Sequence, residues 1–462
     1  MATSAAPVTA PEEKHPKGLY VLFATEMWER FSYYSMLSMF TLYLRDNTGQ
    51  GFAWTSDNAT TLYANYLMFV YASPLVGGWL ADRKLGYRKA VMIGGLFFMA
   101  GHLLLSIRSM TAVYAALTCL VIGNGLFKPN ISAMVGNLYP EGSHLKDRAY
   151  NIFYMGINVG AFLAPVVAEF VKGSFGFHPA FAVAAGGMAL SVSILWKFKR
   201  HIEAVDLQRD ASRAMAVNGS AVAVDAPPAS VSRQDATRSN RQDTMDAVPE
   251  WKRIGALIII FLIVIVFWMV FHQNGSTLTY WANENTNWKV TGIISIAINP
   301  AWVVILTFPM VAMWRWLDRK GMEPSTPVKM AMGMFLTGAA FFVLFIAARV
   351  GEAGVTGPNP YDFRVSPLWL LGAYGVLTAG ELMLSPMGLS LVSKVAPVRF
   401  RGLMMGGWFM ATAIGNKLTQ IGELWDDWLH STFWLLLSGS AVFMAFVLLL
   451  LLRPLKKAMP GV

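Results

Sequence analysis

Long apolar stretches separated by short polar ones recur along the whole chain of 462 residues. Two of the clearest are "IGALIIIFLIVIVFWMVF" and "FWLLLSGSAVFMAFVLLLLL". A helix of about 20 apolar residues crosses the roughly 30 Å hydrocarbon core of a bilayer, and these runs have 18 and 20 residues. The pattern therefore predicts an all-α membrane protein with twelve transmembrane helices. The expected spans are 18–44, 58–81, 89–108, 112–138, 149–171, 179–199, 253–282, 290–315, 328–349, 367–394, 402–422 and 431–452.

The stretch 201–250 interrupts this pattern, because its residues are small, polar and charged, without a helical apolar period. Such a composition is typical of a flexible linker. It divides the chain into two six-helix bundles, 18–200 and 251–453. We expect 1–17 and 454–462 to be short tails on the same side of the membrane as the linker.

Charge then indicates the orientation. Basic residues gather in the loops after even-numbered spans, and cytoplasmic loops are the ones that carry excess lysine and arginine. This predicts a multi-pass membrane protein with both termini in the cytoplasm. We expect the membrane to be the plasma membrane, here the inner membrane of a bacterium. The same topology accounts for the net charge of +10 without a nucleic-acid partner. The basic residues in these cytoplasmic loops are Arg83, Lys84, Arg88, Lys89, Arg315, Arg319, Lys320, Lys394, Arg399 and Arg401.

Two weak sequence similarities between the halves support an internal duplication of the chain. "WLADRKLG" at 79–86 resembles "WLDRKG" at 316–321, just after the second span of each half. "KPNISAMVGNLYP" at 128–140 aligns with "SPMGLSLVSKVAP" at 385–397. Two related halves favour a carrier that holds its substrate near the membrane midplane and alternates access by rocking.

The loop "GGWLADRKLGYRKA" at 77–90 resembles the signature loop of the major facilitator superfamily. Asp82 can accept hydrogen bonds, Gly86 permits a tight turn, and Arg83 is basic. We assign Asp82 and Arg83 to gating or topology. An ordinary basic cytoplasmic loop is the alternative interpretation.

The stretch "EMWERFSYY" at 26–34 places three charges inside the first span. Glu26, Glu29, Arg30 and Tyr33 have i, i+3, i+4, i+7 spacing and form one stripe, in which Arg30 can pair with Glu26. Charges at this depth should face a wet cavity. Two acids share one arginine, so one of them is a candidate proton carrier. A static ion-pair network that fixes helix packing is the alternative.

The whole run "ExxERFSYY" resembles the first-helix motif of the proton-dependent oligopeptide transporters, a family within the major facilitator superfamily. "GNGLFKPNIS", "NIFYMGINVGAFLAP", "FWMVFHQNGS" and "GELMLSPMGLS" agree with it. The resemblance implies proton-coupled symport of dipeptides and tripeptides into the cell by alternating access. A same-family proton-coupled carrier of nitrate or another small solute, or a non-transporting nutrient receptor, are the alternatives.

Several residues fit a zwitterionic substrate. Arg30 and Lys128 are cations available for a peptide carboxylate, and the family resemblance assigns Glu381 to the amino group. It also places Asn158 and Asn299 at the peptide. Snorkelling of Lys128 to the interface and helix packing by the asparagines are the alternatives.

Aromatic residues supply large surfaces with polar tips, which suit side-chain pockets. The family-matched positions are Tyr33, Tyr71, Trp268 and Trp408, with a weaker case for Tyr34. Ordinary core packing is the alternative interpretation of each.

Two features depart from the family pattern. Many bacterial members have two extra helices between the halves, and 201–250 predicts none. Members often have an outer-gate ion pair where this chain has Leu37 and Phe271, so we expect an apolar contact there, with His272 as an unassigned titratable neighbour.

Other classes are disfavoured. The seven histidines show no HExxH or similar pairing, so we expect neither an enzyme nor a metal site, and no cofactor. Cys119 is the only cysteine, which excludes an intrachain disulfide. The set Glu26, Glu29, Arg30 and Lys128 argues instead for proton coupling, with protons, peptides and the lipid bilayer as the expected partners.

Overall fold

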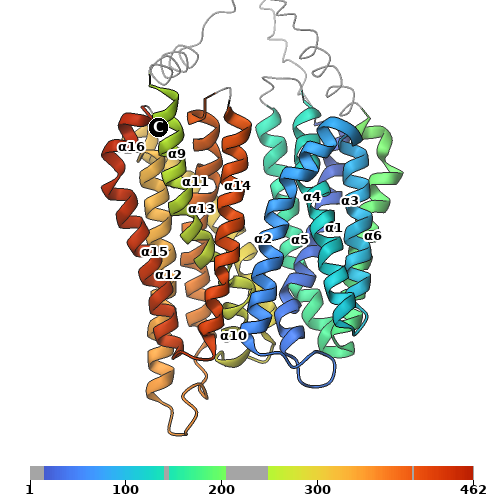
Figure 1. Cartoon of the computed structure of the whole chain (residues 1–462), viewed down its shortest axis with the longest axis vertical. Helices are drawn as coiled ribbons and strands as arrows, with labels where there is room; N and C mark the ends of the chain where they lie inside the picture. Colours follow the sequence, from blue (N-terminus) through green and yellow to red (C-terminus); the bar gives the residue numbers. More distant parts are fainter. Residues whose placement is uncertain (1–14, 140–144, 204–247, 398–399, 461–462) are drawn as a thin grey trace, which may run out of the picture.

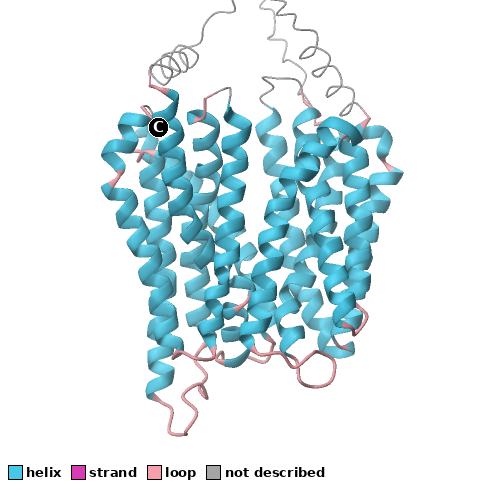
Figure 2. Ribbon diagram, in the orientation of Figure 1, coloured by secondary structure: helices cyan, strands magenta, loops and turns pink. Residues whose placement is uncertain are grey.

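The computed structural model describes residues 15–139, 145–203, 248–397 and 400–460. Within these ranges the chain is almost entirely helical, and the long helices run side by side between two ends (Figures 1 and 2). We call the end at which α6 stops and α9 begins the linker side; the C-terminus lies there too (Figure 1). The opposite end is the far side.

The N-terminal half (N-half) holds six long helices. They are α1 (Lys17–Arg45), α2 (Ser56–Leu80), α3 (Tyr87–Leu105), α4 (Met110–Asn137), α5 (Leu145–Phe175) and α6 (Phe177–Lys197). The short helix η2 (Lys199–Ile202) follows α6. The rest of the expected linker, residues 204–247, lies outside the described residues, so the expectation that it contains no helix stays a prediction.

The C-terminal half (C-half) begins with a broken helix. Its elements are α9 (Glu250–Phe271), η3 (His272–Gly275), α10 (Thr277–Glu284), η4 (Gly292–Ile294), α11 (Ser295–Arg319), α12 (Thr326–Ala353), α13 (Pro367–Val395), α14 (Arg401–Leu418), η6 (Thr419–Trp425), α15 (His430–Leu450) and α16 (Leu452–Ala458). The sequence predicted one continuous span over 253–282, but η3 interrupts it. The expected tail starts as α16, whose Leu455 is buried.

Nine helical segments of the described chain are long and apolar enough to cross a membrane. Helices α1, α2 and α14 are not among these nine, although they lie alongside them in the same bundle (Figure 1). Glu26, Glu29 and Arg30 explain the exception for α1, because charges lower its mean hydropathy. The arrangement agrees with the twelve spans expected from the sequence.

The loop after α2 has the turn expected of it. A π-helical turn, η1 (Ala81–Leu85), ends at Gly86, whose φ of 81° lies in a region that suits glycine. The Tyr87 hydroxyl donates to Asp82 Oδ1 at 2.8 Å, and the Arg83 guanidinium lies 5.4 Å from the Trp79 ring centroid. These contacts fix the loop at the linker side, and its gating role stays a prediction.

The two halves are joined by hydrogen bonds at the far side. Thr41 Oγ1 donates to the Gly275 carbonyl at 3.0 Å, and Lys417 Nζ donates to Asn65 Oδ1 at 2.6 Å. The Gly275 position requires glycine, because a Cβ there would lie 2.0 Å from the Tyr63 hydroxyl of α2. In this conformation the described chain is therefore closed at the far side.

Candidate functional site

Helix α1 carries a buried charge cluster at its middle. Arg30 Nη2 donates to Glu29 Oε1 at 2.6 Å, and Arg30 Nε donates to Glu29 Oε2. The same Nε lies 3.3 Å from Glu26 Oε1, one turn away. The sequence predicted the pair with Glu26, whereas the structure adds a bidentate pair with Glu29, which satisfies more of the guanidinium.

Glu26 is the less satisfied acid of this cluster. Its side chain is 3% exposed, and its Oε2 has no hydrogen-bond partner among the described residues. A buried carboxylate oxygen without a donor is costly. Protonation of Glu26 would remove the buried negative charge and with it part of that cost, and its role as proton carrier stays a prediction.

Two cationic side chains each lie against the face of an aromatic ring. The Arg30 guanidinium lies 5.0 Å from the Tyr33 ring centroid, and Lys128 Nζ of α4 lies 4.7 Å from the Tyr71 ring centroid. Both distances suit a cation–π contact. No carboxylate of the described residues forms an ion pair with Lys128, which leaves its charge available to an anionic group.

The C-half contributes one acid at the same site. Asn299 Nδ2 of α11 donates to Glu381 Oε2 of α13 at 2.9 Å and approaches Thr378 Oγ1 at 3.0 Å. Asn299 thus orients the carboxylate of Glu381. Thr378, which sequence reasoning missed, lies three residues before Glu381 on the same helix face.

A cavity of about 130 Å³ lies between the halves, beside these groups. It joins an apolar and aromatic wall of the N-half to the Asn299–Glu381 pair of the C-half. Sequence reasoning missed Tyr63 and Leu67, although their i, i+4 and i+8 spacing with Tyr71 was a usable signal. The lining residues are Tyr33, Tyr34, Leu37, Tyr63, Leu67, Tyr71, Trp268, Phe271, His272, Asn274, Gly275, Ile296, Asn299, Pro300 and Glu381.

His272 bridges the halves at this cavity. Its Nε2 lies 3.4 Å from the Tyr71 hydroxyl of α2, and its Nδ1 lies 3.3 Å from the Trp268 carbonyl. The Trp268 indole packs on it, with ring centroids 5.1 Å apart, and the indole N–H has no partner among the described residues. A histidine of unassigned role in the sequence thus takes a definite place between α2 and α9.

Four expected substrate residues are not in the cavity lining: Arg30 and Lys128 lie behind its N-half wall, and Asn158 and Trp408 make other contacts. Asn158 donates to the Tyr154 carbonyl of its own helix at 2.9 Å. Trp408 is 3% exposed and packs edge-on against Phe261, and a Cβ added at Gly388 would lie 1.8 Å from its ring. Their role in binding stays a prediction.

Two residues form the expected apolar outer gate, whose gating role stays a prediction. Leu37 and Phe271 are both buried and line the same cavity. A different inter-half ion pair lies further toward the far side, where Arg45 Nη1 and Glu284 Oε1 are 2.7 Å apart. Sequence reasoning missed this pair, because the two residues are separated by 239 positions and by the whole linker.

Comparison with known proteins decides the family. Residues 88–423 match the model of the POT family. The chain belongs to this family.

Relatives of this POT-family chain match it over nearly its full length. It is 30% identical to the "Di-/tripeptide transporter" of Lactococcus lactis subsp. cremoris over 97% of each chain. It is 31% identical to the "Uncharacterized transporter YclF" of Bacillus subtilis, covering 97% of this chain and 96% of the relative.

Solved structures agree. One of peptide transporter POT in complex with sulfate is 29% identical, with a TM-score of 0.81 and coverage of 97% and 96%. One of a POT family transporter in complex with a thioalcohol-conjugated peptide is 26% identical, with a TM-score of 0.80 and coverage of 96% and 97%. The chain thus has the major facilitator fold expected from the sequence.

Proposed function

We propose that this POT-family chain carries dipeptides and tripeptides into the cell together with protons. The observation that carries this proposal is the placement of charge around the inter-half cavity. Two cations lie behind its N-half wall, and an oriented carboxylate, Glu381, lies in its C-half wall. A zwitterion fits such a site, and the relatives named as di- and tripeptide transporters support the same substrate class.

The peptide lies with its carboxylate toward Arg30 and Lys128 and its amine toward Glu381. A ligand that bridges the two halves attracts both, and therefore stabilises the state in which they close around it. The cavity of about 130 Å³ belongs to a chain that is already closed at the far side.

The proton enters at Glu26. Its Oε2, which has no hydrogen-bond partner in the described part of the chain, lies next to Arg30, which pairs with two acids. A substrate carboxylate that draws Arg30 toward itself weakens the Arg30–Glu26 contact, and this favours the protonated acid. Proton and peptide binding then support each other at one guanidinium.

The linker side faces the cytoplasm of a bacterial cell. Exposed basic residues lie at that end, as the positive-inside rule requires. The closed far side is accordingly the outer face, and both described chain ends lie inside.

Uptake into proteoliposomes tests the function. Purified protein is reconstituted, and accumulation of labelled dialanine is followed with and without an inward proton gradient. We expect accumulation only with the gradient, and competition by unlabelled tripeptide but not by nitrate.

A matched control keeps the membrane fold and removes a remote ion pair. Lys329 Nζ is paired with Glu323 near the start of α12, away from the cavity. Glu323→Gln should transport like the wild type, whereas Glu381→Gln should not. Gradient-driven uptake of nitrate in place of dialanine, or saturable binding without uptake, would refute the proposal and favour the small-solute carrier or the receptor.

A further inference from the structure

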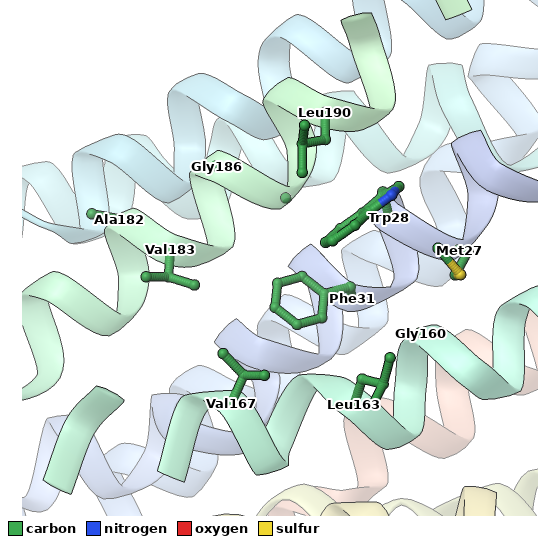
Figure 3. Close-up of a pocket in the computed structure, with 11 residues that line it drawn as sticks. Met27, Trp28, Phe31, Gly160, Leu163, Val167, Ala182, Val183, Gly186 and Leu190 are labelled. Atoms are coloured by element: carbon green, nitrogen blue, oxygen red, sulfur yellow. The ribbon is translucent and has the colours of Figure 1, made fainter. Parts of the chain in front are cut away.

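A groove of about 700 Å³ opens between α1, α5 and α6, away from the inter-half cavity. Figure 3 shows side chains of the three helices converging on it, among them Phe31, Leu163 and Leu190. Its lining side chains are apolar, and Leu163, Gly186 and Leu190 are exposed. Both α5 and α6 are long and apolar enough to span a membrane, so the groove opens toward lipid.

The groove touches the back of the charged stretch of α1. Met27, Trp28 and Phe31 line it, and they alternate along the helix with Glu29 and Arg30 of the ion-pair cluster. The backbone of α5 packs closely here, because a Cβ at Gly160 would lie 2.2 Å from the Met27 carbonyl. An occupant of the groove therefore contacts α1 at the level of its buried charges.

A basic cluster lies at the linker-side end of α6 and in η2, which follows it. Lys197, Lys199 and Arg200 are all exposed, and they follow Leu190 of the groove by seven to ten residues. The first of them stands roughly 10 Å beyond the groove at 1.5 Å per residue.

Exposed aromatic side chains mark the membrane interface at this level. Trp196 of α6 is 66% exposed and Tyr20 of α1 is 56% exposed, as in the aromatic belts of membrane proteins. The η2 segment holds this end of the chain against α1, since a Cβ at Gly18 would lie 2.6 Å from the His201 carbonyl. The basic cluster is thus at headgroup level, and the groove begins within the hydrocarbon.

We propose that this groove binds one anionic phospholipid. Lys197, Lys199 and Arg200 hold its phosphate headgroup, and an acyl chain lies in the groove against α1. One leaflet supplies roughly 15 Å of hydrocarbon, which spans the distance from the cluster to the near end of the groove. Basic side chains near the surface attract anionic headgroups, and the apolar lining accepts only hydrocarbon.

Native mass spectrometry of the purified full-length chain tests the site, with phosphatidylglycerol or phosphatidylcholine added as the probe. We expect one phospholipid to be retained at high collision energy, with at least tenfold preference for phosphatidylglycerol. Equal retention of both lipids would overturn the headgroup assignment. Dimers that form in place of lipid adducts would show that a second copy covers the groove.

A variant that fills the groove distinguishes lipid bound at this site from lipid bound elsewhere on the protein surface. A Cβ at Gly186 meets nothing within 4 Å, so Gly186→Phe projects into the groove without a backbone clash. Gly439 of α15 is equally open, and Gly439→Phe is the matched control. We expect the retained phosphatidylglycerol to be lost only in Gly186→Phe. Ala182→Phe, also in the groove lining, is the second variant if the first folds poorly. Retention in a folded groove variant would overturn the proposal.

The headgroup contacts are tested by charge removal. Combined replacement of Lys197, Lys199 and Arg200 by Gln should weaken phosphatidylglycerol binding roughly 10- to 100-fold. The same change at the exposed residues Arg315, Arg319 and Lys320 of the C-half is the matched control. Equal loss in both triple variants would show non-specific attraction to basic loops and overturn the site.

Lys172 tests which leaflet supplies the lipid. It lies near the far end of α5, with Nζ 5.1 Å from the Phe177 ring centroid. Lys172→Gln should leave phosphatidylglycerol retention unchanged. Loss in this variant would place the headgroup at the far side and contradict the proposed orientation.

Discussion

The far-side closure rests in part on one carboxylate that caps an element of the other half. Glu169 of α5 accepts from the Thr291 backbone N–H at 2.7 Å through Oε1, and from the Thr291 hydroxyl through Oε2. Thr291 precedes η4, which leads into α11. In this closed conformation these bonds join the two halves. Glu169→Ala removes both acceptors, so it should destabilise the closed far side relative to the open one.

The magnitude follows from the bonds lost. A hydrogen bond to a charged group contributes about 1.5–3 kcal/mol, and a partly buried carboxylate recovers part of this from water. A net loss of about 2 kcal/mol for the pair shifts the ratio of closed to open far sides by roughly 30-fold, at 1.4 kcal/mol per tenfold.

Distance measurement by double electron–electron resonance reports this ratio. Cys119 is the only cysteine, so Cys119→Ser gives a cysteine-free background in a single step. Spin labels at Asn47 of the N-half and Asp427 of the C-half are exposed at the far side. Glu169→Ala should increase the long-distance population.

The chain offers a matched control in Glu352. Its two oxygens accept from the Ser431 N–H at 2.8 Å and the Ser431 hydroxyl at 2.6 Å, and both residues belong to the C-half. Glu352→Ala removes the same kind of bond pair without touching the contact between halves. An unchanged distance distribution in Glu169→Ala, or an equal shift in both variants, would refute the reasoning.

Three further predictions concern the cavity. Glu26→Gln and Glu29→Gln should each abolish gradient-driven uptake while peptide counterflow remains measurable; wild-type accumulation in both would remove these acids from coupling. In a double-mutant cycle of Glu381→Gln against a des-amino peptide, we expect a coupling of about 1–3 kcal/mol. Equal loss of affinity for the des-amino peptide in variant and wild type would mean that Glu381 does not hold the amine. Leu37→Asp should open the far side, because it places a charge in the apolar surroundings of Phe271. An unchanged far-side distance would show that the Leu37–Phe271 contact does not control the gate.

The sequence by itself determined the architecture. Apolar runs of membrane-spanning length and the break at 201–250 predict two helical bundles without any knowledge of contacts, because each span satisfies its own backbone hydrogen bonds. The charged stripe of α1 could also be predicted from the sequence. Glu26, Glu29 and Arg30 lie within about one helical turn of each other, and their spacing decides which side chains can form ion pairs.

Only the tertiary structure decided how distant residues meet. The Arg45–Glu284 pair, the Asn299–Glu381 bond and the cap of Thr291 by Glu169 each join separate helices. No local spacing relates such partners, because their distance depends on how the bundles pack and on which end of the molecule is closed. The break of α9 at η3 was missed although the polar residues 272–276 interrupt the hydrophobic pattern there. The close approach of Tyr63 to Gly275, by contrast, joins the two halves and depends on how they pack.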